Sequence, residues 1–178
     1  MDANPTCTSS EMFDYSTRCS WDKASVWKGS VLRRFKDNYM VVQWFTYPQG
    51  GGIITPREFL EARLVRRDPD GHLYLTSPSI DDATVKGLGI KFTPGEGSTR
   101  AKTFPGNGFS LEPLEALKPG DDPDGFMNFK MTLISCIELG GWLAPGLVNL
   151  FTTQSLVDSS DRECARFKIA FPPPKHSG

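Results

Sequence analysis

The chain has 178 residues, with 20 basic and 21 acidic side chains, a formal net charge of −1 and a hydrophobic fraction of 38%. This length fits one domain with a sizeable core, and the balanced charge excludes a general electrostatic attraction to nucleic acid. The composition is typical of a soluble globular protein, and no apolar run approaches membrane-spanning length.

The N-terminal residues 1–10 are rich in Thr and Ser and predict a flexible segment. Met1 precedes polar residues, not a basic and then apolar stretch, so no signal peptide is predicted. The four cysteines form no CxxC pair and have no metal-ligand spacing; they are Cys7, Cys19, Cys136 and Cys164. These features predict a cytoplasmic protein with free thiols and without a metal or another cofactor.

The first half of the chain predicts a short helix followed by strands. The helix is expected after Glu11, and residues rich in β-branched and aromatic side chains predict strands starting at Val26 and over residues 38–46, 59–65 and 72–77. Residues 48–52 interrupt this series with Pro and Gly, and residues 68–71 predict a hairpin turn.

The second half predicts more strands and then a closing helix. Strands are expected over residues 86–93, 98–105, 109–114 and 126–139, with a turn at 94–97 and a loop at 118–125. In the last strand, alternation places Met131, Leu133, Ser135, Ile137 and Leu139 on one face. An approximate helical stripe begins near Pro145, which suits a first helical turn. Antiparallel strands followed by a helix predict an α+β fold.

Three stretches, in this order, carry a resemblance to a known family. Arg18-Cys19-Ser20-Trp21-Asp22 is similar to an Arg-x-x-Trp-Asp motif, and residues 55–63 are similar to a Pro-Arg-Asp-Phe-Val-x-x-Arg strand. Residues 140–149 are similar to a corner in which Gly-Trp leads to Pro and, four residues later, to Asn. The chain therefore resembles the START domain, the lipid-transfer domain named after the steroidogenic acute regulatory protein. We expect a START-like domain over residues 11–170 and a Pro-rich tail over 171–178.

The resemblance implies a helix-grip fold, in which a curved antiparallel sheet wraps a long C-terminal helix around an internal cavity. It implies that one sterol, phospholipid or ceramide lies in this apolar tunnel and is carried between membranes without chemistry on it. The implied partners are the lipid and, transiently, a membrane surface. The family opens with a helix and several strands that have no room ahead of Arg18 here, so we expect an exposed sheet edge.

Arg63 and Glu61 are the main candidate binding residues. In the family, an arginine at the position of Arg63 faces the tunnel, often opposite an acid on a neighbouring strand. By alignment that acid would fall near Gln43 or Trp44, and neither is acidic. Glu61 shares a face with Arg63, so we expect it to replace the missing acid. The competing interpretation is that both charges lie on a solvent-exposed face.

The other residues expected to line the cavity come from two strands and the closing helix; they are Trp44, Leu133, Ser135, Ile137, Leu147, Val148 and Phe151. For Ser135 a hydrogen bond to backbone or water competes with a bond to a lipid hydroxyl. The apolar helix residues alone would indicate only a buried helix. Residues 76–84 are expected to form an exposed, flexible loop near the tunnel entrance.

Two other functions remain open from the sequence. A regulatory or interaction module could keep this fold without transferring lipid. A cavity enzyme of the helix-grip group is the third interpretation, but the only histidines, His72 and His176, have no recognised nucleophile or carboxylate arrangement. We therefore expect a protein that is not an enzyme.

Overall fold

The computed structural model describes residues 2–3, 15–22, 26–36, 38–46, 48, 52, 54–115, 127–141, 143, 146, 157–158 and 161–162. Most of the expected C-terminal helix and the Pro-rich tail lie outside these residues. So do three of the predicted cavity residues, Leu147, Val148 and Phe151.

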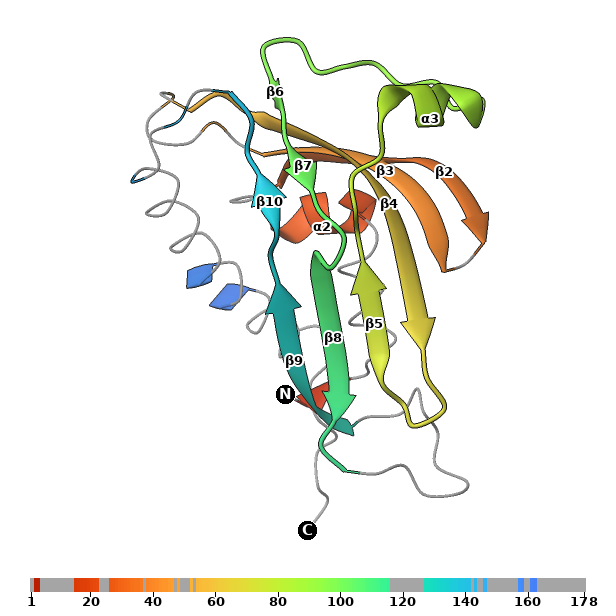
Figure 1. The fold of residues 1–178 in the computed structure, drawn as a ribbon. Coiled ribbons are helices and arrows are strands. Elements are labelled where there is room, and N and C mark those ends of the chain that lie inside the picture. Colours follow the sequence, from red (N-terminus) through yellow and green to blue (C-terminus); the bar gives the residue numbers. More distant parts are fainter. Residues whose placement is uncertain are drawn as a thin grey trace.

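A curved antiparallel sheet dominates the fold (Figure 1). Its strands are β1 (Asp2–Ala3), β2 (Val26–Lys36), β3 (Tyr39–Thr46), β4 (Arg57–Arg67), β5 (Leu73–Thr76), β8 (Gly108–Pro113) and β9 (Met127–Ile134). They are arranged in the order β1-β9-β8-β5-β4-β3-β2, and β6 (Thr99–Arg100) pairs in parallel with β4. A second, two-stranded sheet joins β7 (Lys102–Thr103) to β10 (Ile137–Glu138).

Around β3 and β4 the main sheet is buried on both faces. We call inner the face that carries the larger cluster, which contains Met40, Val42, Leu73, Leu75, Phe109, Leu111 and Phe129. Cys19 of helix α2 (Tyr15–Trp21) packs against this cluster. On the outer face, Val41 and Leu60 pack against Val85 of helix α3 (Asp82–Gly87) and against Ile90. Two buried faces explain why β3 and β4 are almost continuously apolar or buried.

The strand predicted over residues 86–93 is wrong, because α3 ends there and no strand follows before β6. Asp81 caps this helix by accepting a hydrogen bond of 2.6 Å from the Thr84 N–H. The expectation that residues 76–84 are exposed is also wrong for Ser77, which is buried and accepts a hydrogen bond from the Thr103 hydroxyl at its carbonyl oxygen.

The long strand predicted over residues 126–139 is interrupted. β9 ends at Ile134, and the next strand, β10, pairs with β7 in the second sheet. The Asn107 side chain accepts a hydrogen bond from the Cys136 N–H, and the Cys136 carbonyl accepts one from the Phe104 N–H. These bonds divert the chain away from β8.

The N-terminal residues lie at one edge of the main sheet. Asp2 and Ala3, predicted to belong to a flexible segment, form β1 and pair with Asn128 and Met127 of β9. Cys19 and Cys136 are free thiols. Among the described residues, no helix is long and apolar enough to cross a membrane.

Candidate functional site

The candidate site lies on the inner face, where β3 and β4 pair. Trp44 stands opposite Phe59, and their rings stack at 4.1 Å with planes 6° apart. The next two inner positions of β4 are Glu61 and Arg63, opposite the fully buried Val42 and Met40. The sequence alternation therefore places two charged side chains in apolar surroundings.

Glu61 and Arg63 form a buried ion pair. Glu61 Oε2 accepts hydrogen bonds from Arg63 Nη2 at 3.0 Å and from Arg63 Nε at 3.1 Å. The side chains are only 1% and 4% exposed. The expected pairing is present, and the competing interpretation of two solvent-exposed charges is wrong. The role of the pair in binding lipid stays a prediction.

The register also corrects the alignment used for the missing acid. The residue opposite Arg63 on β3 is Met40, whereas Gln43 lies opposite Leu60 and on the other face of the sheet. β3 contains no acidic residue, so it cannot supply an acid to Arg63. The acid two positions earlier on the same strand, Glu61, pairs with the guanidinium.

Burial raises the pKa of the Glu61 carboxyl, and the charge of Arg63 is the main opposing influence. The nearby side chains of Arg63, Trp44 and Thr103 also favour the charged form. Thr103 comes from β7 and is 4% exposed; its N–H donates to Ser79 Oγ at 2.8 Å. Thr103 could not be identified from the sequence, because no local pattern shows that β7 lies beside β4.

Of the three remaining predicted cavity residues that the structure describes, only Leu133 lies in the inner row of the main sheet; the other two are Ser135 and Ile137. Leu133 belongs to the inner row of β9 and is 38% exposed, next to the half-buried Met131. Ser135 lies in the interruption between β9 and β10 and does not continue this row. Ile137 stands opposite Thr103 in the second sheet and is 37% exposed. Met40, Val42 and Phe59 were missed as neighbours of the site, although the alternation from Trp44 could have identified them.

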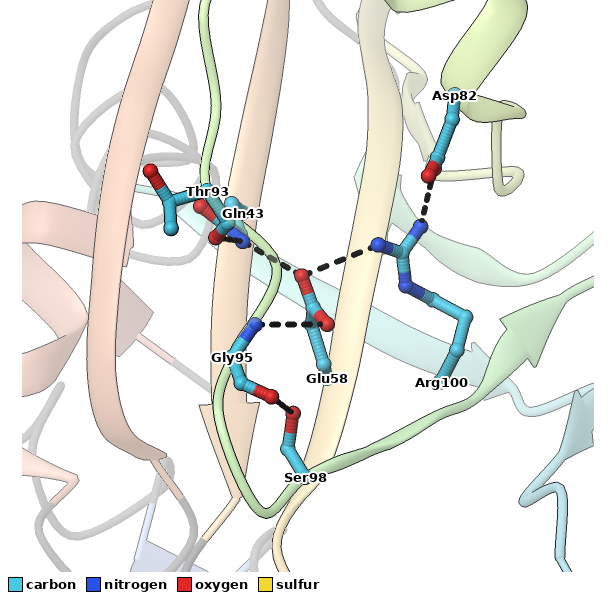
Figure 2. Close-up of polar contacts among 7 residues, drawn as sticks. All are labelled: Gln43, Glu58, Asp82, Thr93, Gly95, Ser98 and Arg100. Carbon is cyan, nitrogen blue, oxygen red and sulfur yellow. Dashed lines mark hydrogen bonds and ion pairs between the residues drawn. The ribbon is translucent and has the colours of Figure 1, made fainter.

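A second buried acid on β4 faces the opposite way. Figure 2 shows Glu58, which is 3% exposed and accepts hydrogen bonds from Gln43 at 2.6 Å and from Arg100 at 3.2 Å. It also accepts a bond of 3.2 Å from the Gly95 N–H, and Arg100 in turn binds Asp82 of α3 at 2.9 Å. This outer-face network fastens α3 and the loop around Gly95 to the sheet.

Arg57 connects the beginning of β4 to the Gly-Gly corner. Its Nη1 donates to the Thr55 carbonyl at 2.8 Å and to the Thr55 hydroxyl at 2.7 Å, and its Nη2 lies 3.4 Å from the Gly140 carbonyl. Burial lowers the pKa of Arg57. Arg57 belongs to the second motif, residues 55–63, and Gly140 belongs to the third, residues 140–149. The contact between them joins the two motifs.

The first motif forms its own buried cluster. Asp22, whose side chain is 1% exposed, accepts hydrogen bonds from Arg18 at 3.0 and 3.1 Å. Arg162 approaches the other carboxylate oxygen at 3.2 Å. Asp22, the residue that follows α2, therefore binds both Arg162, which lies near the C-terminus, and Arg18 of α2.

The family model of the START domain matches residues 2–169. The chain belongs to the START family. The three motifs, the antiparallel sheet and the buried arginine on β4 agree with that assignment, and the predicted α+β helix-grip fold is confirmed. A search of curated protein sequences finds no match.

Solved structures share the START fold. Human StAR-related lipid transfer protein 5 is 23% identical, with a TM-score of 0.63 over 86% of this chain and 63% of its own. Human STARD10 is 15% identical, with a TM-score of 0.68 over 96% of this chain and 60% of its own. The lipid transfer and protein localization domain of human StarD13 is 19% identical, with a TM-score of 0.61 over 98% of this chain and 75% of its own. The chain thus spans less than two thirds of the first two structures.

Proposed function

We propose that this START chain binds one lipid against the inner face of its sheet and carries it between membranes. The buried Glu61–Arg63 pair is the observation that carries this proposal, because an apolar face needs no ion pair for folding alone. Membership of the START family and the lipid-transfer names of the neighbouring structures support it.

The energy for binding would come from burying the lipid's apolar surface. Transfer from water contributes roughly 25 cal/mol per Å², so several hundred Å² give on the order of 10 kcal/mol before ordering costs. Trp44, Met131 and Leu133 are only partly buried on this face and would contribute to that contact. Leu147, Val148 and Phe151 are the proposed contribution of the closing helix.

The ion pair would orient the polar end of the lipid. A guanidinium supplies several N–H donors in one plane and a carboxylate supplies acceptors, so both hydroxyl and phosphate groups can be recognised. Recognition of this kind holds the lipid in place and breaks no bond in it. We therefore propose binding and transfer at membrane surfaces in the cytoplasm, without catalysis.

Native mass spectrometry after incubation with liposomes that contain a sterol, a phosphatidylcholine and a ceramide tests this proposal. We expect one lipid per chain, with a clear preference for one class. A Glu61→Leu/Arg63→Met double variant should stay folded and lose that preference by about tenfold, which corresponds to ~1.4 kcal/mol.

Glu58→Gln is the matched control, because it alters an equally buried acid of the same strand on the outer face. It should lower stability and leave the lipid preference unchanged. If the wild-type chain takes up no lipid, the proposal fails and a regulatory module without transfer becomes the better interpretation. If the double variant keeps the preference, the orienting role of the pair is wrong.

A further inference from the structure

Exposed basic side chains gather on the outer face, where α3 approaches the end of β2 (Figure 1). Leu32 of β2 packs against the outer cluster that contains Val85 of α3, so the strand and the helix are neighbours. Arg33 follows Leu32, and Lys36 ends the strand. Both basic side chains are exposed and stand opposite residues of β3 that face outward.

A hydrogen bond joins this part of β2 to the end of α3. Arg33 Nη1 donates to the carbonyl of Leu88, the C-cap of the helix, at 2.6 Å. Arginine side chains commonly satisfy the last carbonyls of a helix in this way. Lys86 lies in the last turn of α3 and is exposed. Three basic side chains, from Arg33, Lys36 and Lys86, are thus held at one corner of the molecule.

Two apolar side chains are exposed at the same corner. Phe35 is a residue that the register between β2 and β3 skips, and bulges of this kind redirect a side chain. Its ring stacks on that of Tyr39 at 5.0 Å, the guanidinium of Arg33 lies 5.0 Å from its centre, and Phe35 remains 37% exposed. Leu88 is also 37% exposed. We call this group the β2–α3 patch; it consists of Arg33, Phe35, Lys36, Lys86 and Leu88.

The acidic residues that the structure describes near the patch are engaged elsewhere. Asp82 lies one helical turn before Lys86, but its carboxylate binds Arg100 at 2.9 Å. Asp81 accepts a hydrogen bond from the Thr84 N–H at the opposite end of α3. β2 itself contains no acidic residue. The patch therefore presents positive charge around exposed apolar side chains.

We propose that the β2–α3 patch docks the chain on membranes that contain anionic lipids. Anionic head groups attract Lys and Arg side chains close to the surface, and Phe and Leu side chains can enter the apolar boundary beneath the head groups. Nucleic acid would match the charge but would leave Phe35 and Leu88 without a role. The patch lies on the outer face, so it contacts the membrane and not the lipid that the inner face carries.

This inference rests on the proposed function, because transfer between membranes requires a surface that meets them. It adds that the surface selects membranes by their charge. Docking can be measured without lipid uptake, so the two proposals can be tested separately.

Co-sedimentation with vesicles of phosphatidylcholine, with and without phosphatidylserine, tests the docking surface. We expect the chain to bind at least tenfold more tightly to vesicles that contain phosphatidylserine, and added salt to weaken this binding by screening the charges. Lys36→Glu/Lys86→Glu should weaken binding to these vesicles at least tenfold (about 1.4 kcal/mol), because it reverses two charges of the patch.

Lys28→Glu/Lys130→Glu is the matched control. It makes the same change in net charge at two exposed positions outside the patch, one at the other end of β2 and one on β9. This control should bind anionic vesicles clearly more tightly than Lys36→Glu/Lys86→Glu. Circular dichroism should show that both double variants are folded, because none of the four side chains is buried.

Three results would overturn the docking proposal. They are equal binding to neutral and anionic vesicles, an equal loss in the two double variants, and binding to a DNA duplex without binding to vesicles. A chain that docks through the patch but takes up no lipid would uphold this inference and refute the proposed function. A chain that takes up lipid but does not bind anionic vesicles would do the reverse.

Discussion

At the scale of single residues, the site depends on two side chains that are close in sequence. Glu61 and Arg63 share a face of β4 because strand side chains alternate, so their pairing needs no knowledge of the neighbouring strand. This local pair could therefore be predicted from the sequence. Thr103, which also contacts Glu61, could not, because its position depends on how the chain returns between β6 and β8.

Removing one member of the pair should destabilise the fold more than replacing both. Glu61→Ala leaves the Arg63 guanidinium buried without its acid, and we expect a loss of about 3–5 kcal/mol in the free energy of unfolding. Glu61→Leu/Arg63→Met should recover most or all of that loss, because well-packed apolar side chains avoid the desolvation cost. Urea denaturation of the three proteins measures both values.

Arg66→Ala is the control for these variants. Arg66 lies on the same strand, but its side chain is 73% exposed and its partner is Asp68. An exposed pair contributes about 0–1 kcal/mol, so this change should be small. A Glu61→Ala protein as stable as Arg66→Ala would show that the buried pair does not support the fold.

At the scale of elements, local patterns located the strands better than they located the places where strands stop. β3, β4 and β5 were predicted because their β-branched and aromatic residues are contiguous. The end of β9 was missed because it depends on hydrogen bonds from the main chain of Cys136 to Asn107 and Phe104, which are distant in sequence. Helix α3 was missed because it has only 6 residues and its beginning was expected to be part of the flexible loop over residues 76–84.

The first residue of the Gly-Gly corner, Gly140, has both a backbone conformation and a close contact that favour glycine. Gly140 has φ +65°, and a Cβ there would lie 2.4 Å from the Arg100 carbonyl oxygen. Gly97 has a similar φ of +70° with open space around it. Gly97→Ala should therefore cost about 1–2 kcal/mol from backbone strain alone. Gly140→Ala should cost clearly more, because the main chain of β6 or of the corner must also move.

Thermal unfolding of the two glycine variants separates these effects. The melting temperature of Gly140→Ala should lie below that of Gly97→Ala. Equal melting temperatures would mean that the corner accommodates a side chain without strain beyond that of its backbone conformation. The close approach between Gly140 and the Arg100 carbonyl would then matter less than the structure indicates.

At the scale of the whole molecule, the two faces of the sheet make different contacts. The outer face holds α3 through the Glu58–Arg100–Asp82 network (Figure 2). The inner face contains the Glu61–Arg63 pair among apolar residues. The START fold could be predicted from three motifs in order, because each marks a place where distant segments meet. The register between β3 and β4 could not, since it depends on pairing across the whole strand.

The most direct measurement of the central claim is photo-cross-linking with a lipid that carries a diazirine in its acyl chain, followed by mass spectrometry of the peptides. We expect one label per chain, on inner-face residues such as Trp44, Met131 and Leu133, and we expect the unlabelled lipid to compete with the labelling. Labels on the outer face around Phe92 and α3, or labelling that an excess of unlabelled lipid does not reduce, would contradict it.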